Sequence, residues 1–424
     1  MTRRVVIVGG GAAGALVALH LLRDTTNITE LTVVEPRERL AEGVAYSTAD
    51  SAHLLNVPAA GMSAYDDDPG NFVRWVGCES DDFVARHRYS EYLRDELQRV
   101  AASRPRTRFV HVRERAENIV AKRSDVRNEL SARRELSVRT ARAGKLLADA
   151  VVLALGNAPP MRPAWCGEVE LARLIADPWA PGALDDIGDG ERVLCVGTGL
   201  TFVDVALTLS RRGARVTGTS RHGLLPTVHQ QHVHATPIVP ARFESPAAVS
   251  RWLRAQSDWR AAFTALRPHT QRIWRGFSAA QQAQFLRHAR RHWDVHRHRM
   301  SKTVADELHD HLRYGRVRVV RDDARALATS RDFSRVILCT GPDDTALLRQ
   351  APLASLVADG VVRPGPHGIG IDADPDSGQV CDATNRLVDG LYAIGTLRRG
   401  TLWESTAVPE LRAQAGHLAA VLDA

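Results

Sequence analysis

The fold of this chain is decided by residues 5–35, which read VVIVGGGAAGALVALHLLRDTTNITELTVVE. The apolar run 5–8 predicts a buried strand, residues 12–23 predict a helix, and the run 31–34 predicts a second strand. Glycines in the pattern G-x-G-x-x-G lie between the first strand and the helix. An ordinary glycine-rich turn is the alternative interpretation, but a strand, turn, helix and strand in this order indicate a dinucleotide-binding βαβ unit.

Each glycine of this turn has a physical role in binding a pyrophosphate. Gly9 allows the tight turn, Gly11 lets the phosphates approach the backbone, and Gly14 permits close packing of the helix on the strand. The first amides of the helix then face the phosphates. Glu35 ends the second strand, where a carboxylate accepts hydrogen bonds from the adenosine ribose hydroxyls. We expect this turn to hold FAD through Gly9, Gly11, Ala12, Ala13, Gly14 and Glu35.

A second turn of the same kind follows at residues 193–209, which read VLCVGTGLTFVDVALTL. Here Phe202 stands where a third glycine is expected. After the next predicted strand, Arg221 occupies the region where a carboxylate would select NAD, and a guanidinium there suits the 2′-phosphate of NADPH. The alternative is that Arg221 is one more arginine in an arginine-rich chain. We expect NADPH to be bound by Gly197, Thr198, Gly199, Leu200, Ser220 and Arg221.

Short β-branched runs alternate with amphipathic stretches along the chain, which predicts βαβ units on parallel sheets. The expected fold class is α/β, with two Rossmann-like dinucleotide-binding domains, one for FAD and one for NADP, and the second inserted in the first. The other predicted strands are 109–112, 151–155, 193–196, 216–219, 317–320, 336–339 and 391–394.

The FAD-binding domain is expected to be discontinuous, over residues 1–165 and 335–424, with the NAD(P)-binding domain over residues 166–334. Gly156 and Gly341 each follow a predicted strand and precede a proline-containing loop. Chain crossings between the two nucleotide domains of such flavoenzymes lie at such places, so both glycines are expected beside a cofactor.

Three other stretches complete the expected organisation. Residues 116–147 are polar and alternate, which predicts a small antiparallel sheet. Residues 246–312 have no strand pattern and carry aromatic residues at helical spacing, which predicts a helical insertion. Gly395 follows the last strand and precedes a helix at about residues 407–422, so it is expected to lie against the flavin side chain or pyrimidine ring.

The composition is that of an ordinary globular protein and excludes several functional classes. A net charge of +7 comes from scattered arginines nearly matched by acids, so no nucleic-acid face is expected. No apolar run is long enough for a membrane span or a signal peptide, and a soluble protein in the cytoplasm is expected. The five cysteines are far apart and include no C-x-x-C pair, which argues against a disulfide reductase.

Over nearly its whole length the chain resembles the YdhS-like FAD/NAD(P)-binding proteins, a bacterial family related to flavin-dependent N-hydroxylating monooxygenases. One departure is DFVARHRYSEYL (82–93), in which Ala85 and Ser90 alter a Pro-Arg-x-x-Tyr-Gly pattern. The motifs that carry the resemblance are VVIVGGGAAG (5–14), GVAYSTADSAHLLNVPAAGMSAY (43–65), VLCVGTGLTFVDVALTL (193–209), SRHGLLP (220–226), WDVHRHRM (293–300) and LWESTAVPELRAQA (402–415).

This resemblance implies roles for a loop at residues 53–63, which would run along the flavin. Met62 and Ser63 would lie beside the reactive edge of the ring, and Asn56 would hydrogen-bond the flavin or the nicotinamide amide. The alternative is that the loop is merely structural. Glu404 is the best placed carboxylate for the flavin pocket, or else a capping residue of the last helix.

The expected function is an FAD-dependent, NADPH-reduced monooxygenase. Through a flavin C4a-hydroperoxide it would hydroxylate a nitrogen, or another nucleophilic atom, of a small substrate such as an amine or amino acid, with dioxygen as co-substrate. Two alternatives are an NADPH-dependent flavin reductase or dehydrogenase without oxygen transfer, and a nucleotide-sensing binding protein. A homo-oligomer is left open.

Two groups of histidines attract attention as candidate ligands. His288, His292 and His296 recur every fourth residue, but without carboxylate or thiol support we expect no metal. His229, His232 and His234 form a second group in a loop and would either line a pocket for an anionic compound or be exposed.

Overall fold

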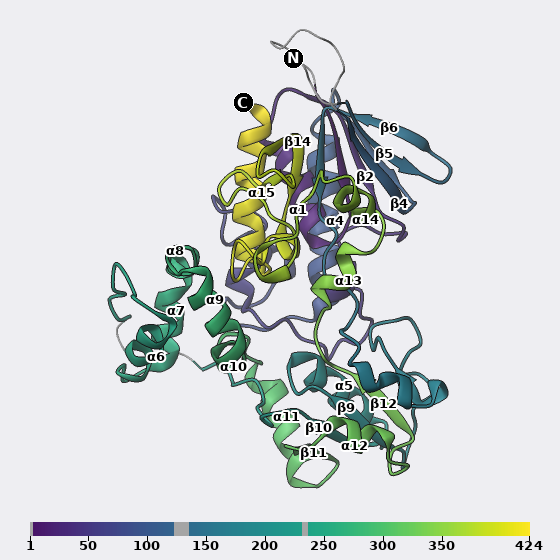
Figure 1. The fold of residues 1–424 in the computed structure, drawn as a ribbon, viewed down its shortest axis with the longest axis vertical. Coiled ribbons are helices and arrows are strands. Elements are labelled where there is room, and N and C mark those ends of the chain that lie inside the picture. The colour runs from purple at the N-terminus through teal and green to yellow at the C-terminus, as the bar shows by residue number, and fades with distance from the viewer. Residues whose placement is uncertain (1–2, 123–134, 231–235) are drawn as a thin grey trace. The chain divides into compact units, whose positions relative to one another are not determined.

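A computed structural model describes residues 3–122, 135–230 and 236–424 (Figure 1). The chain divides into two compact units, one comprising residues 1–157 and 344–424 and the other residues 158–343. His232 and His234 lie outside the described residues. In the part of the chain that is described, every helix is too short or too polar to cross a bilayer.

The discontinuous unit is built on a six-stranded sheet in the order β13-β14-β7-β1-β2-β3. All neighbouring strands are parallel except β13 and β14. A second, antiparallel sheet of β4, β5 and β6 confirms the small sheet expected from the alternating sequence. The strands are β1 (Arg3–Val8), β2 (Ile28–Val34), β3 (Arg108–Val112), β4 (Ala116–Lys122), β5 (Glu135–Thr140), β6 (Gly144–Ala148), β7 (Ala150–Leu153), β13 (Gln379–Cys381) and β14 (Leu387–Ala393).

The core of this unit lies between the sheet and the helices that cover it. Val5, Val6, Ile7 and Val8 are each at most 2% exposed, as a central parallel strand covered on both faces requires. Helix α1 packs against both α15 and α4 (Figure 1). The helices are α1 (Ala12–Asp24), α2 (Gly43–Tyr46), α3 (Asn71–Val76), α4 (Arg86–Ala102), α13 (Asp344–Leu348), α14 (Leu353–Ala358) and α15 (Val408–Asp423), with 3₁₀ turns η1 (Ala59–Gly61), η6 (Pro366–Gly368) and η7 (Gly395–Arg398).

The continuous unit is built on a five-stranded sheet in the order β11-β10-β9-β12-β8, all parallel. Helix α5 packs on β9 and β10, and α11 packs on α5. The strands are β8 (Leu174–Ile175), β9 (Arg192–Val196), β10 (Arg215–Thr219), β11 (Val317–Val320) and β12 (Arg335–Leu338), and the sheet helices are α5 (Leu200–Arg211), α11 (Lys302–Arg313) and α12 (Ala324–Thr329), with 3₁₀ turns η2 (Ala164–Glu168) and η3 (Leu171–Arg173).

Helices replace strands between β10 and β11, where the sequence predicts a helical insertion. Four residues form a small core of their own there: Phe243, Val249, Leu266 and Phe277. The insertion contains α6 (Pro246–Arg254), α7 (Trp259–Leu266), the 3₁₀ turn η4 (Arg267–His269), α8 (Thr270–Gly276), α9 (Ala279–Gln284), a π-helical turn η5 (Phe285–Ala289) and α10 (Arg290–Arg297).

These two mainly parallel sheets confirm the α/β class with two Rossmann-like units. The chain passes between units after Asn157 and after Asp343, whereas the sequence suggested 165 and 334. The shift has a local cause. Pro160 forms an antiparallel bridge with Pro342, and the Met161 N–H donates to Gly341 O at 2.8 Å, so the segment after Asn157 already pairs within the continuous unit.

Candidate nucleotide-binding sites

The turn after β1 is held by contacts that leave no room for a side chain. Gly9 has φ +102°, and its N–H donates to Val34 O at 2.9 Å. A Cβ at Gly9 would lie 2.3 Å from Ala154 O, and one at Gly14 would lie 1.9 Å from Gly9 O. Only glycine tolerates such approaches, so the turn packs directly against the end of β7.

The start of α1 is open to an anion. Gly11 is the N-cap residue, no side chain caps the helix, and no acid lies in its first turn. A Cβ at Gly11 would meet only the backbone of Gly43, its Cα at 3.4 Å and its N at 3.8 Å. Helix N-terminal amides without a side-chain cap are a seat for phosphate, so the backbone of Ala12 and Ala13 fits the predicted pyrophosphate contact.

Glu35 lies at the carboxyl end of β2 and is 5% exposed. Its Oε2 accepts the Gly10 N–H at 2.9 Å, and its Oε1 accepts the Arg37 N–H at 3.1 Å and Arg37 Nη1 at 3.3 Å. A Cβ at Gly10 would lie 2.7 Å from the Cβ of Glu35. Gly10 is therefore a further residue of this site that the G-x-G-x-x-G pattern does not mark; the run of three glycines is its signal in the sequence.

The turn after β9 has the same backbone conformation and the same close contacts at its first glycine as the turn after β1. Gly197 has φ +109°, and its N–H donates to Thr219 O at 2.8 Å. A Cβ at Gly197 would lie 2.2 Å from Cys339 O. The corresponding distance in the first turn, from a Cβ at Gly9 to Ala154 O, is 2.3 Å. Gly199 is the N-cap residue of α5, which no side chain caps and whose first turn holds no acid. Two equivalent turns, one in each unit, therefore carry the features of a dinucleotide cradle.

Phe202 takes the place of the third glycine without opening the turn. Its side chain is 0% exposed, and Gly218 in β10 provides the space for its ring. A Cβ at Gly218 would lie 2.5 Å from Phe202 Cε2. The glycine that the motif lacks on the helix is thus replaced by a glycine on the neighbouring strand, which accounts for the incomplete motif.

A hydroxyl pair stands where the first turn has its carboxylate. Thr198 Oγ1 donates to Leu224 O at 2.6 Å and lies 2.8 Å from Ser220 Oγ. Since the proton of Thr198 is directed to Leu224, the Ser220 hydroxyl donates to Thr198. Ser220 also accepts the Gly223 N–H at 3.0 Å. No carboxylate follows β10 here; the exposed Arg221 comes next in the chain.

Gly395 is fixed by the start of the last helix. It has φ +70°, its N–H donates to Gln414 Oε1 at 3.1 Å, and its carbonyl accepts the Ser405 hydroxyl at 2.9 Å. Arg398, 3% exposed, donates to the carbonyls of Asp374 and Pro375 at 3.0 and 2.8 Å. Burial lowers the pKa of Arg398 to about 10, so this guanidinium is still charged at neutral pH.

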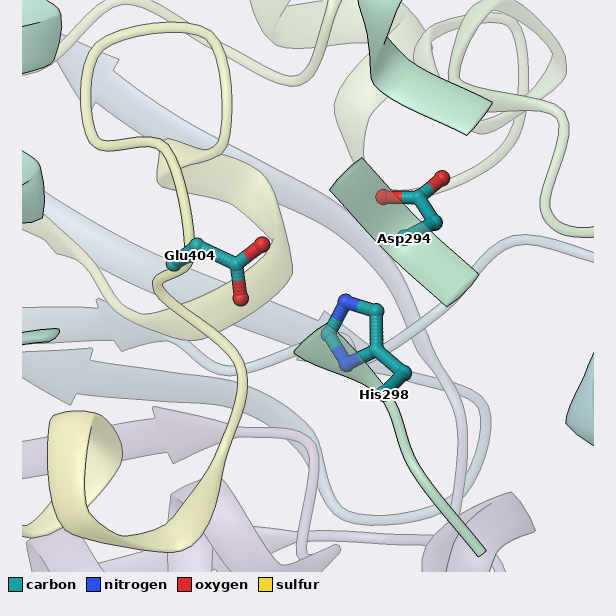
Figure 2. Close-up of side chains that lie close together, drawn as sticks. All are labelled: Asp294, His298 and Glu404. Carbon is teal, nitrogen blue, oxygen red and sulfur yellow. The ribbon is translucent and has the colours of Figure 1, made fainter. Parts of the chain in front are cut away.

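Glu404 lies in the irregular segment between η7 and α15 (Figure 2). The N-cap of α15 is Ala407, which has no capping side chain. Both interpretations of Glu404, in the flavin pocket or as a capping residue, stay predictions. Glu404 has φ +62°, a conformation that costs a residue with a side chain on the order of 1 kcal/mol. Such backbone strain is concentrated at functional segments.

The loop at residues 53–63 is more enclosed than the resemblance implies. Met62 is 1% exposed and belongs to the apolar core. Ser63 is 0% exposed; its hydroxyl donates to Asp68 O at 2.7 Å and accepts the Tyr65 N–H at 3.1 Å. These bonds give Ser63 a role in holding the loop, and they leave one lone pair of its hydroxyl oxygen for a further hydrogen bond. Asn56 is half-buried in the same loop.

The altered motif at 82–93 keeps its local contact. Arg86 Nε donates to Leu54 O at 3.0 Å, and Leu54 forms an antiparallel bridge with Ala85. The Arg86 N–H also donates to His53 O at 2.9 Å. The segment that begins α4 therefore supports the 53–63 loop although the proline and glycine of the pattern are absent.

Gly156 and Gly341 both have positive φ, +71° and +80°. In neither case would an added Cβ meet another atom within 4 Å. The open space beside each glycine is compatible with the predicted closeness to a cofactor, which stays a prediction.

Histidines 288, 292 and 296 do not converge. His288 lies in the π-helical turn, which alters the spacing to His292. The ring of His292 lies 5.9 Å from that of His222, whereas the ring of His296 packs edge-on to Trp259 at 4.8 Å. At the end of α10, the His298 N–H donates to Asp294 O at 2.8 Å. Figure 2 shows the side chains of these two residues.

Residues 6–158 match the family model described as FAD-NAD(P)-binding. The match covers most of the first segment, residues 1–157, of the discontinuous unit. The match and the two nucleotide turns confirm the prediction of FAD and NADP(H) as cofactors, and the coarse class of a flavin-dependent oxidoreductase. No curated protein is significantly similar to the chain in sequence.

Solved structures share the fold over the full chain. Ornithine hydroxylase from Pseudomonas aeruginosa in its reduced form gives a TM-score of 0.60 at 13% identity, covering 100% of this chain and 99% of that one. A flavin-containing monooxygenase from Stenotrophomonas maltophilia gives a TM-score of 0.57 at 19% sequence identity, with 99% of this chain and 98% of that chain covered. Bacillithiol disulfide reductase from Bacillus cereus gives a TM-score of 0.55 at 15% sequence identity, with 100% of this chain and 99% of that chain covered. At these identities the similarity shows the fold alone.

Proposed function

We propose that this chain is an FAD-dependent, NADPH-reduced monooxygenase that hydroxylates a nitrogen, or another nucleophilic atom, of a small substrate. The observation that carries the proposal is the pair of equivalent turns at Gly9 and Gly197. A flavoenzyme that takes hydride from a nicotinamide must bind two dinucleotides, and two such turns offer a cradle for each. We also propose membership of the YdhS-like family, with the cytoplasm as the predicted location.

FAD is assigned to the discontinuous unit. Its pyrophosphate would lie on the amides that begin α1, and its ribose would hydrogen-bond the buried carboxylate of Glu35. When bound, FAD accepts the hydride and activates dioxygen. The chain's own part is to orient the ring and exclude water, for which we propose the neighbourhood of Gly156, Gly395 and the 53–63 loop. Asn56, Ser63 and Glu404 stay the proposed catalytic side chains, and Met62 a proposed flavin contact.

NADPH is assigned to the continuous unit, with its pyrophosphate on the amides that begin α5. Ser220 replaces the acid that would repel a 2′-phosphate, and Arg221 supplies a charge that attracts it. Replacing Arg221 by Ala should weaken NADPH binding by about tenfold, the loss of one charge-assisted hydrogen bond, and leave NADH binding unchanged. Equal affinities of wild type and variant for NADPH, measured by titration, would contradict the assignment.

For the substrate we propose an amine or amino acid. The similarity to structures named ornithine hydroxylase and L-lysine 6-monooxygenase supports this class. A reductase is the second candidate, because bacillithiol disulfide reductase shares the fold to a similar degree. The absence of a C-x-x-C pair argues against disulfide chemistry in this chain.

The two candidates separate in one experiment. NADPH-driven oxygen consumption is measured with a panel of amines and amino acids, and the products are weighed after reaction under labelled dioxygen. A monooxygenase predicts consumption that rises with one substrate class and a label in the organic product. Oxygen appearing only as hydrogen peroxide with every compound, while NADPH is oxidised, would contradict the monooxygenase and favour the reductase.

A further inference from the structure

Five basic side chains meet at the carboxyl ends of two neighbouring strands of the continuous unit. Residue 219 of β10 pairs with residue 320 of β11, so the residues that follow both strands emerge at one edge of the sheet. A Cβ at Gly223 would lie 3.6 Å from the Cβ of Arg321. We name these five residues the basic cluster: Arg221, His222, Arg291, His292 and Arg321.

Helix α10 of the insertion closes the cluster from the other side. The ring of His292 lies 5.9 Å from the ring of His222, and Arg291 precedes His292 in the same helix. The cluster therefore draws on three segments: the loop after β10, the residue after β11, and the insertion. The sequence marked only Arg221 for NADPH, because Arg291, His292 and Arg321 are distant from it along the chain.

The five side chains repel one another without an acidic partner. Within the described residues, no carboxylate forms an ion pair with any member of the cluster. Desolvation, and then the neighbouring arginines 291 and 321, lower the pKa of the exposed His222. Burial and then Arg221 lower the pKa of Arg291; Asp294 opposes this effect but pairs with Arg290 at 3.5 Å. A concentration of unpaired positive charge of this kind attracts a multivalent anion.

We propose that the basic cluster binds the 2′-phosphate of NADPH between the β10 loop and helix α10, and that the His222–His292 pair makes this binding proton-dependent. The inference rests on the proposed function, since it assumes that NADPH occupies this unit. It adds to Arg221 four residues of the specificity site, two of them from the helical insertion.

The sign of the pH effect follows from the charges. The arginines at 221, 291 and 321 and the partner histidine oppose protonation of His222 in the free protein, and no acid among the groups facing it compensates. A phosphate dianion beside the cluster favours the protonated form of His222, so binding takes up a proton and affinity falls as the pH rises through neutrality. Protonation of the phosphate itself, below about pH 6, acts in the opposite direction.

The test uses the full chain with its flavin and calorimetric titration with adenosine 2′,5′-bisphosphate, a probe that carries the 2′-phosphate. Arg291→Ala should weaken binding about tenfold, and ADP, which lacks this phosphate, should bind both proteins equally. Arg290→Ala is the matched control: it removes the same charge from the adjacent position of α10, but from an arginine paired with Asp294, and should leave the affinity unchanged.

The proton dependence has its own variant. Between about pH 6.5 and about pH 8 the wild type should lose affinity for the bisphosphate several-fold, whereas a chain carrying both His222→Gln and His292→Gln should not. An unchanged affinity of Arg291→Ala, or the same pH dependence in wild type and double variant, overturns the inference. If neither NADPH nor NADH binds the wild-type chain, the proposed function itself has failed.

Discussion

At the scale of single residues, Phe202 and Gly218 explain how a nucleotide turn survives the loss of a motif glycine. The ring of Phe202 fills the space beside Gly218 on the adjacent strand. A Cβ added at Gly218 would lie only 2.5 Å from Cε2 of this ring. The motif in the sequence marks the missing glycine, but not its replacement, because residues 202 and 218 become neighbours only when α5 packs on β10.

This pairing predicts strong coupling between the two positions. Gly218→Ala should destabilise the wild type by about 1–3 kcal/mol through overpacking. In a Phe202→Leu background the same change should cost markedly less, since the atom it collides with is gone. The free energies of unfolding of the two single variants and the double variant measure the coupling by a mutant cycle. Additive costs would show that the two residues do not interact.

Other residues show where prediction from sequence stops. The roles of the glycines at 9, 14 and 197 could be predicted, because the close backbone contacts at these positions leave room for no side chain. Ser63 and Met62 stay proposed neighbours of the flavin through a family resemblance, and the structure adds that both are buried. A family motif shows which residues recur. It does not show that the Ser63 hydroxyl donates to Asp68 O, because that bond depends on how the chain after residue 63 folds back.

At the scale of elements, helix N-termini divide into two kinds. Several helices in or beside the insertion are capped by side chains: Ser245 caps α6, Asp258 caps α7 and Ser278 forms a capping box on α9. The helices that follow the two glycine turns have no side-chain cap, and neither do α4, α8 and α15. An uncapped helix forgoes about 1 kcal/mol of stability, which is consistent with a ligand that supplies the missing acceptor.

The difference gives a prediction for α5. Gly199→Asp places a good N-cap residue at the start of the helix, in a backbone conformation that suits one and with no atom within 4 Å of the new Cβ. Thermal stability should stay equal or rise, while NADPH affinity should fall by at least about tenfold because a carboxylate occupies the phosphate seat. Flavin content should not change.

A matched control is Gly188→Asp, which adds the same charge at another open glycine of this unit. It should leave NADPH affinity unchanged. Undiminished NADPH binding by the Gly199→Asp protein would mean that the amides of α5 do not hold a pyrophosphate.

The sequence predicted the central strands of both sheets, because continuous apolar runs are characteristic of buried parallel strands. Helix α4 is absent from the predicted elements although Tyr89, Leu93, Leu97 and Val100 recur at helical spacing. Its many charged residues obscure that apolar stripe. Strands β8 and β13, of two and three residues, are too short to give a periodic signal.

At the scale of the whole molecule, the sequence predicted two nucleotide units with one inserted in the other. The exact crossings could not be predicted, since a bridge such as Pro160 to Pro342 joins residues far apart in the chain. Neither sequence nor fold identifies the substrate, because monooxygenases and reductases share this architecture.

The central claim is that one chain holds FAD and NADPH in two separate cradles and passes a hydride between them. An anaerobic titration of the purified protein with NADPH, followed by its visible spectrum, tests this most directly. We predict a yellow protein with FAD in equal amount to the chain, whose flavin absorbance is bleached by NADPH. A colourless protein that takes up no flavin, or bound FAD that NADPH never reduces, would contradict the account.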